Sequence, residues 1–118
     1  MFDRTNIFEV PLERRQAHGG EGQIAFHRIA TAEEMAGGCN FIDVAVVPPG
    51  TTIGLHRHRP TEEEYYLLLD GEGVMTREGE ELHLRAGDLV RNPPGGAHTF
   101  RTTGSEPVRL FVFELSVR

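Results

Sequence analysis

The sequence predicts an all-β protein built as a sandwich or a barrel, and three observations support this. Fourteen glycines and seven prolines are many for 118 residues. They fall between short apolar runs and do not form a low-complexity tract. From residue 40 onward, turn signals recur about every eight to twelve residues, the rhythm of sandwiches and barrels. No linker or repeat divides the sequence, so we expect one domain over residues 1–118.

The expected strands lie between Gly, Pro and Asp residues that favour turns. In chain order they cover 41–47, 51–58, 64–69, 74–77, 82–85, 89–91, 97–102 and 108–117. Residues 1–39 are less regular, with candidate strands at 7–10 and 24–29. There, Thr31 and Glu34 have the form of a capping box that begins one helical turn, which Gly37 ends.

Charge and hydropathy exclude several classes of protein. The net charge of −6 is spread along the chain, whereas nucleic-acid binding needs a basic patch. No run approaches the roughly 18 apolar residues of a membrane span, and the first residues lack the pattern of a signal peptide. The single cysteine, Cys39, cannot form an internal disulfide. We therefore expect a cytoplasmic protein with neither nucleic-acid nor membrane partners.

A group of histidines and glutamates has the pattern of a metal site. His56 and His58 are two residues apart, so on a strand both side chains point to one face, about 6.6–6.8 Å apart. The run 62–64 of three glutamates follows, and His98 comes after a Pro-Pro-Gly-Gly turn. Three imidazoles and one carboxylate suit one divalent ion of Fe, Mn, Ni, Cu or Zn. Such a set leaves coordination positions open for chemistry.

The spacing of these residues resembles the cupin family. The first cupin motif, G-x5-H-x-H-x3-4-E-x6-G, is matched by Gly50, His56, His58, a glutamate and Gly71. The second, G-x5-P-x-G-x2-H-x3-N, is matched by Gly87, Pro93, Gly95 and His98, with Thr102 in place of the final Asn. The resemblance implies an antiparallel jelly-roll β-barrel over residues 40–118. It also implies metal ligation by His56, His58, Glu64 and His98.

One extra residue between His58 and Glu64 leaves the fourth ligand open between two glutamates. Counting forward from His58, Glu63 fits the motif, and counting back from Gly71, Glu64 fits. An insertion is easier in the turn 59–61 than within a strand, where a slip of one residue reverses every side chain. We therefore favour Glu64, with Glu63 as the alternative and Glu62 facing solvent.

If Glu64 points inward, Tyr66 and Leu68 share its face. Tyr66 is the candidate catalytic residue, as a hydrogen-bond donor to substrate or a general acid. The alternative is a wall aromatic whose hydroxyl is satisfied by backbone. Phe100 shares the face of His98 and is expected to be apolar pocket wall.

Other reactive side chains are expected to have no role in the site. His18 lies in a glycine-rich loop that we expect to be mobile, and His27 and His83 are remote from both motifs. All three are expected to be non-ligands. Cys39 is expected to be a buried thiol, not a nucleophile. Arg91 and Arg101 are expected at the surface, and the sequence does not fix which way Arg28 and Asp43 face.

The resemblance implies a metal-dependent enzyme acting on a small organic molecule. Cupins with this ligand set include dioxygenases, isomerases, decarboxylases, lyases and cyclases. The alternative is a non-catalytic sensor or sugar-binding protein. Phe111, Phe113 and Leu115 form an apolar face on the last strand, suited to the core or to a subunit interface. With the family's habit of pairing, this face leads us to expect a homodimer.

Overall fold

The structure, a computed structural model, describes residues 2–118 and is made almost entirely of β-strands. The strands are β1 (Glu13–Arg15), β2 (Ile24–Thr31), β3 (Cys39–Val47), β4 (Thr52–Arg57), β5 (Glu62–Asp70), β6 (Glu72–Arg77), β7 (Glu80–Arg85), β8 (Leu89–Asn92), β9 (Ala97–Thr102) and β10 (Val108–Ser116). A 3-10 helix, η1 (Ala32–Glu34), follows β2. The all-β prediction is confirmed. Within residues 2–118, no helix is long and apolar enough to cross a membrane.

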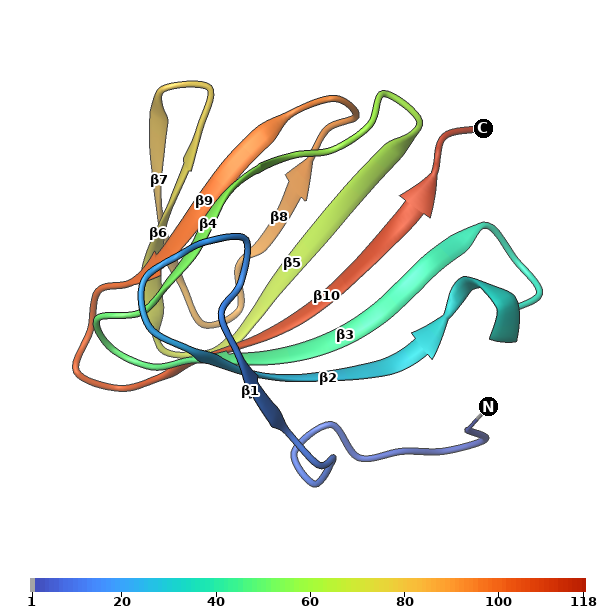
Figure 1. Cartoon of the computed structure of the whole chain (residues 1–118), viewed down its shortest axis with the longest axis horizontal. Coiled ribbons are helices and arrows are strands. Elements are labelled where there is room, and N and C mark those ends of the chain that lie inside the picture. Colours follow the sequence, from blue (N-terminus) through green and yellow to red (C-terminus); the bar gives the residue numbers. More distant parts are fainter. Residues whose placement is uncertain (1) are drawn as a thin grey trace.

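The strands form two antiparallel sheets that enclose the core (Figure 1). One sheet has the order β1-β2-β3-β10-β5-β8 and the other the order β4-β9-β6-β7. No strand ladder joins the two sheets within residues 2–118, so the jelly roll is an open, two-layered barrel. Both layers contribute fully buried side chains to the core: Leu68, Leu110, Val108 and Val47 from the larger sheet, and Met75 and Phe100 from the smaller.

Strand β10 shows how alternation separates the two faces of the larger sheet. Leu110 and Val112 are buried in the core, whereas Phe111 and Phe113 point to the outer face and are only half-buried. On that face the ring of Tyr65 stacks on Phe113 with centroids 5.0 Å apart. The apolar face expected on this strand is therefore external and not part of the core. The homodimer stays a prediction.

The strands expected after residue 40 are all present, but the expected strand at 7–10 is wrong. Asn6 accepts hydrogen bonds there from the backbone of Phe8 and Glu9, through its side chain and its carbonyl. An asparagine that bonds to the backbone two residues on favours a turn. Regular pairing begins at β1, which joins the edge of the larger sheet beside β2.

Two motif positions explain how the chain turns from one sheet to the other and how the sheets are linked. Gly71 has φ +80°, and a Cβ there would lie 2.6 Å from the carbonyl oxygen of Pro107, so only glycine fits the turn between β5 and β6. Thr102 stands where the motif has Asn, and its hydroxyl donates to the Val47 carbonyl at 2.8 Å. This bond links β9 of one sheet to β3 of the other.

Candidate metal centre

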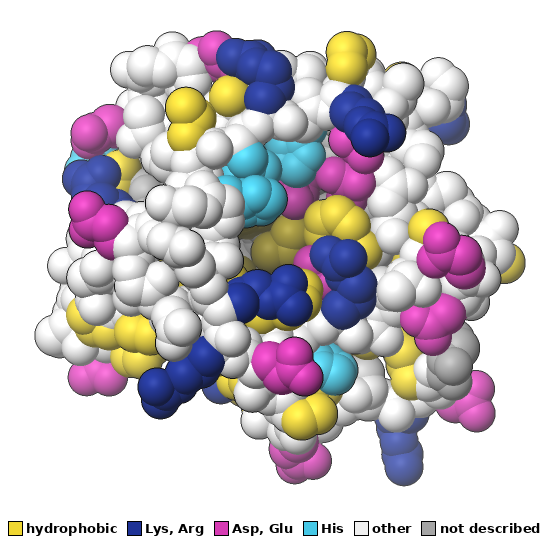
Figure 2. Space-filling model, viewed as in Figure 1, with side chains coloured by type: hydrophobic (Ala, Val, Ile, Leu, Met, Phe, Trp, Pro, Cys, Tyr) yellow, Lys and Arg dark blue, Asp and Glu magenta, His cyan; other side chains and the backbone are white. Residues whose placement is uncertain are grey.

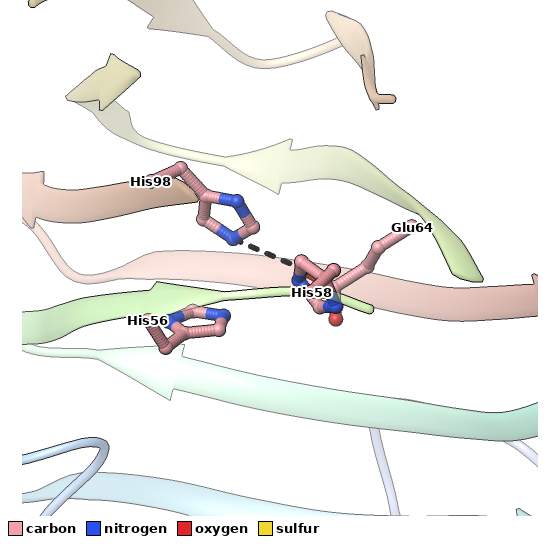
Figure 3. A group of neighbouring side chains, drawn as sticks. All are labelled: His56, His58, Glu64 and His98. Atoms are coloured by element: carbon pink, nitrogen blue, oxygen red, sulfur yellow. Dashed lines mark hydrogen bonds and ion pairs between the residues drawn. The ribbon is translucent and has the colours of Figure 1, made fainter. Parts of the chain in front are cut away.

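Four side chains, three of them on strands and one just beyond a strand, come together between the sheets (Figure 3). His56 on β4 pairs directly with His98 on β9, which places both imidazoles on the inner face of the smaller sheet. His58 lies just beyond β4, and Glu64 reaches in from β5 of the facing sheet. One ligand atom from each residue lies within 4.8 Å of the others.

His58 is held between two carboxylates. Its Nδ1 lies 3.0 Å from Oε1 of Glu114, and its Nε2 lies 3.1 Å from Oε1 of Glu64. The bond to Glu114, followed by the bond to Glu64, raises the pKa of His58 to about 10 in spite of burial. These contacts fix the orientation of the ring, with Nε2 facing the cluster.

Glu64 and His56 have the charge states that metal ligands need. Burial alone would raise the pKa of Glu64, but its contacts with His58 and His98 outweigh this and lower it to about 2. Burial lowers the pKa of His56 to about 4, so this imidazole is neutral near pH 7. Its Nδ1 lies 3.0 Å from the Gly54 carbonyl oxygen, which leaves Nε2 for the cluster.

His98 supplies the strongest structural sign that the cluster fits an ion. It is 1 % exposed, and its buried Nε2 makes no hydrogen bond among residues 2–118, although Oε1 of Glu64 lies 3.2 Å away. Buried nitrogens are rarely left without a partner. Three imidazoles and a carboxylate match the preferences of divalent transition metals, so the residues present fit such an ion.

A chain of hydrogen bonds holds the Nδ1 side of the His58 ring, away from the cluster. Glu114 accepts through Oε2 from the Asn40 side chain at 2.9 Å, and Asn40 accepts in turn from the Ser116 hydroxyl at 2.8 Å. A carboxylate behind a histidine fixes its tautomer and increases its basicity as a ligand. Neither Glu114 nor Asn40 belongs to the two motifs, so sequence analysis missed both.

A cavity of about 240 Å³ opens beside the cluster. His56 and Glu64 line it, together with Tyr66 and with Asp43, which is bound by Arg28. Figure 2 shows the hollow on this face, with histidine, hydrophobic and Lys/Arg side chains around it. Arg28 and Asp43, which the sequence could not orient, thus both face the cavity.

Tyr66 lies at the base of this cavity. It is 3 % exposed, and its ring meets that of His98 edge-on, with centroids 5.5 Å apart. Burial, with the nearby charges of Glu64 and Asp43, raises the pKa of Tyr66 well above 10. Its hydroxyl makes no hydrogen bond to residues 2–118, so the backbone bond offered as its alternative role is not present.

His18 lies against the cluster, although the sequence gave no reason to place it there. Its ring stacks on His56 with centroids 3.8 Å apart, and it lines the cavity. The surrounding loop is docked on β4 and is not free: the Gly54 amide donates to the Ala17 carbonyl, and the Thr52 amide donates to the Glu21 carbonyl. The loop therefore belongs to the cavity wall, and the prediction that His18 is not a ligand stays a prediction.

The remaining candidates lie outside the cluster. Glu63 points to the other face of β5, where its carboxylate lies 3.6 Å from the Arg91 guanidinium. Glu62 does not face free solvent: it is half-buried, accepts from the Arg59 amide, and has a ligand atom within 4.8 Å of ligand atoms of His58 and Glu114, a second group that could hold an ion. His83 is exposed on β7. Phe100 is fully buried in the core and does not line the cavity, so its assignment as pocket wall was wrong.

The remaining side chains give a mixed outcome. His27 lies on β2, outside the cluster, and Arg101 is exposed on β9 as expected. Cys39 begins β3 and is only partly buried; burial raises the pKa of its thiol, which favours the unreactive form.

A further buried polar group, missed by sequence analysis, is Asn92. It pairs with Glu64 across β5 and β8, and both its amide atoms lack a partner among residues 2–118.

The antiparallel jelly roll, with a His/Glu cluster beside an internal cavity, defines the class of barrel to which this chain belongs. This chain belongs to the cupin family, because the model of the Cupin domain matches residues 43–114. It is 33 % identical to an oxalate-binding protein of Thermotoga maritima, over 82 % of this chain and 80 % of that protein.

Two further comparisons bear on fold and activity. A crystal structure of a predicted oxalate decarboxylase from Thermotoga maritima superposes with a TM-score of 0.88 at 27 % identity, covering 95 % of this chain and 97 % of that one. The quercetin 2,3-dioxygenase of Bacillus subtilis is 31 % identical over 64 % of this chain, but only 22 % of that enzyme is covered. Relatives in this family thus include both enzymes and binding proteins.

Proposed function

We propose that this chain is a mononuclear metal-dependent enzyme that converts a small organic molecule inside the barrel. One observation carries the proposal: His56 and Glu64, two of the four clustered donors, also line the cavity into which Tyr66 faces. A divalent ion with an open coordination position would supply Lewis-acid or dioxygen chemistry there.

The chain's own residues would divide the work between holding the ion and handling the ligand. His56, His58, Glu64 and His98 would be the metal ligands. Tyr66 would donate a hydrogen bond or a proton to the ligand, since the raised pKa keeps its hydroxyl protonated near pH 7. The buried walls around Tyr66 would exclude water, which strengthens polar interactions within the cavity.

Elemental analysis of the purified protein tests the metal site. We expect about one divalent transition-metal ion per chain, lost in His56→Ala and retained in His83→Ala, which removes an exposed histidine far from the cluster. Iron or copper would direct the search to oxygenase reactions, and zinc, nickel or manganese to isomerase, lyase or cyclase reactions. Native protein that neither contains nor takes up any of these ions would contradict the proposal.

A second candidate function is binding without chemistry. It is favoured by the relative named as an oxalate-binding protein, which is similar over most of both chains. Turnover separates the two functions: Tyr66→Phe would abolish conversion in an enzyme, but would only weaken ligand affinity in a binding protein.

A further inference from the structure

Part of the cavity wall is built by residues 15–28, which precede the matched cupin domain of residues 43–114. We call this segment the N-terminal wall. It contributes Arg15 from β1, His18 from the docked loop, and Phe26 and Arg28 from β2. None of these four residues belongs to the two histidine motifs.

The two arginines of the N-terminal wall differ in what they bind. Arg28 forms a two-pronged ion pair with Asp43, at 2.9 and 3.0 Å, so its charge is matched within the protein. The guanidinium of Arg15, an exposed residue, forms no ion pair within residues 2–118, although it lies near enough to Asp43 for their charges to interact. It lies over the Phe26 ring, 4.0 Å from the centroid. A cation at a cavity that no carboxylate contacts directly favours an anionic ligand.

The N-terminal wall is positioned by close backbone packing. A Cβ on Gly20 would lie 2.2 Å from the Thr52 carbonyl oxygen, and one on Gly54 would lie 2.0 Å from the His18 carbonyl oxygen. Only glycines permit this approach of the loop to β4. His18 itself has φ +49°, a left-handed conformation uncommon for residues other than glycine. These contacts hold the loop within the same cavity as the metal cluster.

Apart from Gln16, the rest of the lining is apolar. Ile24, Ala45, Ile53 and Val112 contribute to the cavity. The volume of about 240 Å³ is below the roughly 300–1,000 Å³ of pockets for drug-sized ligands. A ligand of matching chemistry is short, with a small apolar body between its polar ends.

We propose that the N-terminal wall selects the ligand: a small organic acid that places one oxygen donor at the metal cluster and a second, anionic group against Arg15, with a short apolar body between them. The inference rests on the proposed function and names the ligand class of that site. A guanidinium suits this role because its planar fork matches a carboxylate with two parallel hydrogen bonds.

Calorimetric titration of the Co²⁺-loaded protein tests the proposal. The probes are the straight-chain dicarboxylates from oxalate to adipate, each beside its monoamide, which has the same length and one charge fewer. We expect at least one diacid longer than oxalate to bind more tightly than its monoamide. Arg15→Gln should reduce the affinity for that diacid tenfold or more and leave that for the monoamide unchanged, whereas Arg15→Lys should retain part of the preference.

The matched control is Arg14→Gln, which removes the same charge from the neighbouring exposed residue of β1 that does not line the cavity. It should bind every probe as the wild type does. Equal losses in the two glutamine variants, no preference for diacids, or no binding of any acid to Co²⁺-loaded protein would overturn the inference alone. Failure of Co²⁺ to bind at all would overturn the proposed function, and this inference with it.

Discussion

The metal cluster and the N-terminal wall occupy the same cavity but are built in different ways. The cluster lies within the matched cupin domain, and its orientation follows from strand pairing, as in the direct pairing of His56 with His98. The N-terminal wall lies before that domain and depends on a loop whose glycines contact β4. If the proposed function holds, metal binding and ligand selection are therefore separable in this chain, and substitutions should affect one without the other.

The largest effect on metal binding is expected at one of two adjacent glutamates, each replaced separately. Glu64→Gln removes the carboxylate of the cluster. We expect metal affinity to fall by more than about a hundredfold, because losing a direct ligand should cost more than losing a residue that only supports a ligand. Glu63→Gln should bind metal normally, because Glu63 points to the opposite face beside Arg91. Competition with a chelator of known affinity measures both. The reverse ranking would assign the ligand to Glu63.

Glu114→Gln should have the next largest effect, on the support behind the cluster. Without its carboxylate, His58 loses the partner that orients its Nδ1 at 3.0 Å. After correction for the lower pKa that His58 has without Glu114, we expect metal affinity to fall about 10- to 100-fold, the range for such supporting groups, with binding stoichiometry retained at high metal concentration. Unchanged affinity would show that the ring is positioned by the fold alone. Glu63→Gln, which alters a carboxylate on the opposite face of β5 beside Arg91, serves as the control.

Metal affinity should rise about tenfold for each unit of pH between about 6 and 8. The pKa of His58 is raised to about 10 by Glu114 and Glu64, so one proton must leave when its Nε2 binds an ion. His56, with a pKa lowered to about 4, loses no proton in this range. Proton release on adding metal in weak buffer measures the coupling, and a release near zero would contradict it.

The raised pKa of His58 should also make the stability of the metal-free protein depend on pH. A pKa raised in the folded state stabilises the fold fully below the ordinary value of 6.5, and the contribution is lost as pH rises through about 10. Chemical denaturation of metal-free protein between those limits should show falling stability. Added metal should offset that loss.

The smallest effect on metal binding is expected from a change that affects the N-terminal wall alone. Gly20→Ala places a methyl group against the Thr52 carbonyl and should cost about 1–3 kcal/mol of folding free energy, as for other overpacked sites. Metal content should be unchanged, while any preference for diacids should be lost with the displaced loop. Gly37→Ala, where nothing lies within 4 Å of the added Cβ, is the control.

The difference between these regions also explains what the sequence could predict. The clustered residues could be predicted because the spacing of two motifs resembles the cupin family. Short-range rules then favoured Glu64, because two residues on a strand share a face and a turn absorbs an inserted residue. The choice of Glu64 over Glu63 agrees with the arrangement of the cluster for that reason. His18 could not be found in this way, since its stacking on His56 depends on a loop docking against a strand that begins more than thirty residues later.

Glu114 and Asn92 illustrate a second limit of sequence reasoning. Each occupies an inward position on a strand whose buried and exposed residues alternate regularly. Nothing in the local sequence therefore distinguishes it from a core residue. The partner of Glu114, Asn40, is 74 positions away in the chain. The turn at residues 7–10 was missed because the side chain of Asn6 outweighed the β-favouring residues that follow it.

The alternation of β5 separates the only two tyrosines of the chain, which are adjacent in sequence. Tyr66 lies in the cavity against His98, and Tyr65 lies on the outer face against Phe113. Because the chain has no tryptophan, its near-ultraviolet spectrum arises almost entirely from these two phenols. A ligand entering the barrel perturbs the absorption of one, and contact between outer faces perturbs the other. The unlabelled protein thus carries an optical probe for each side of one sheet.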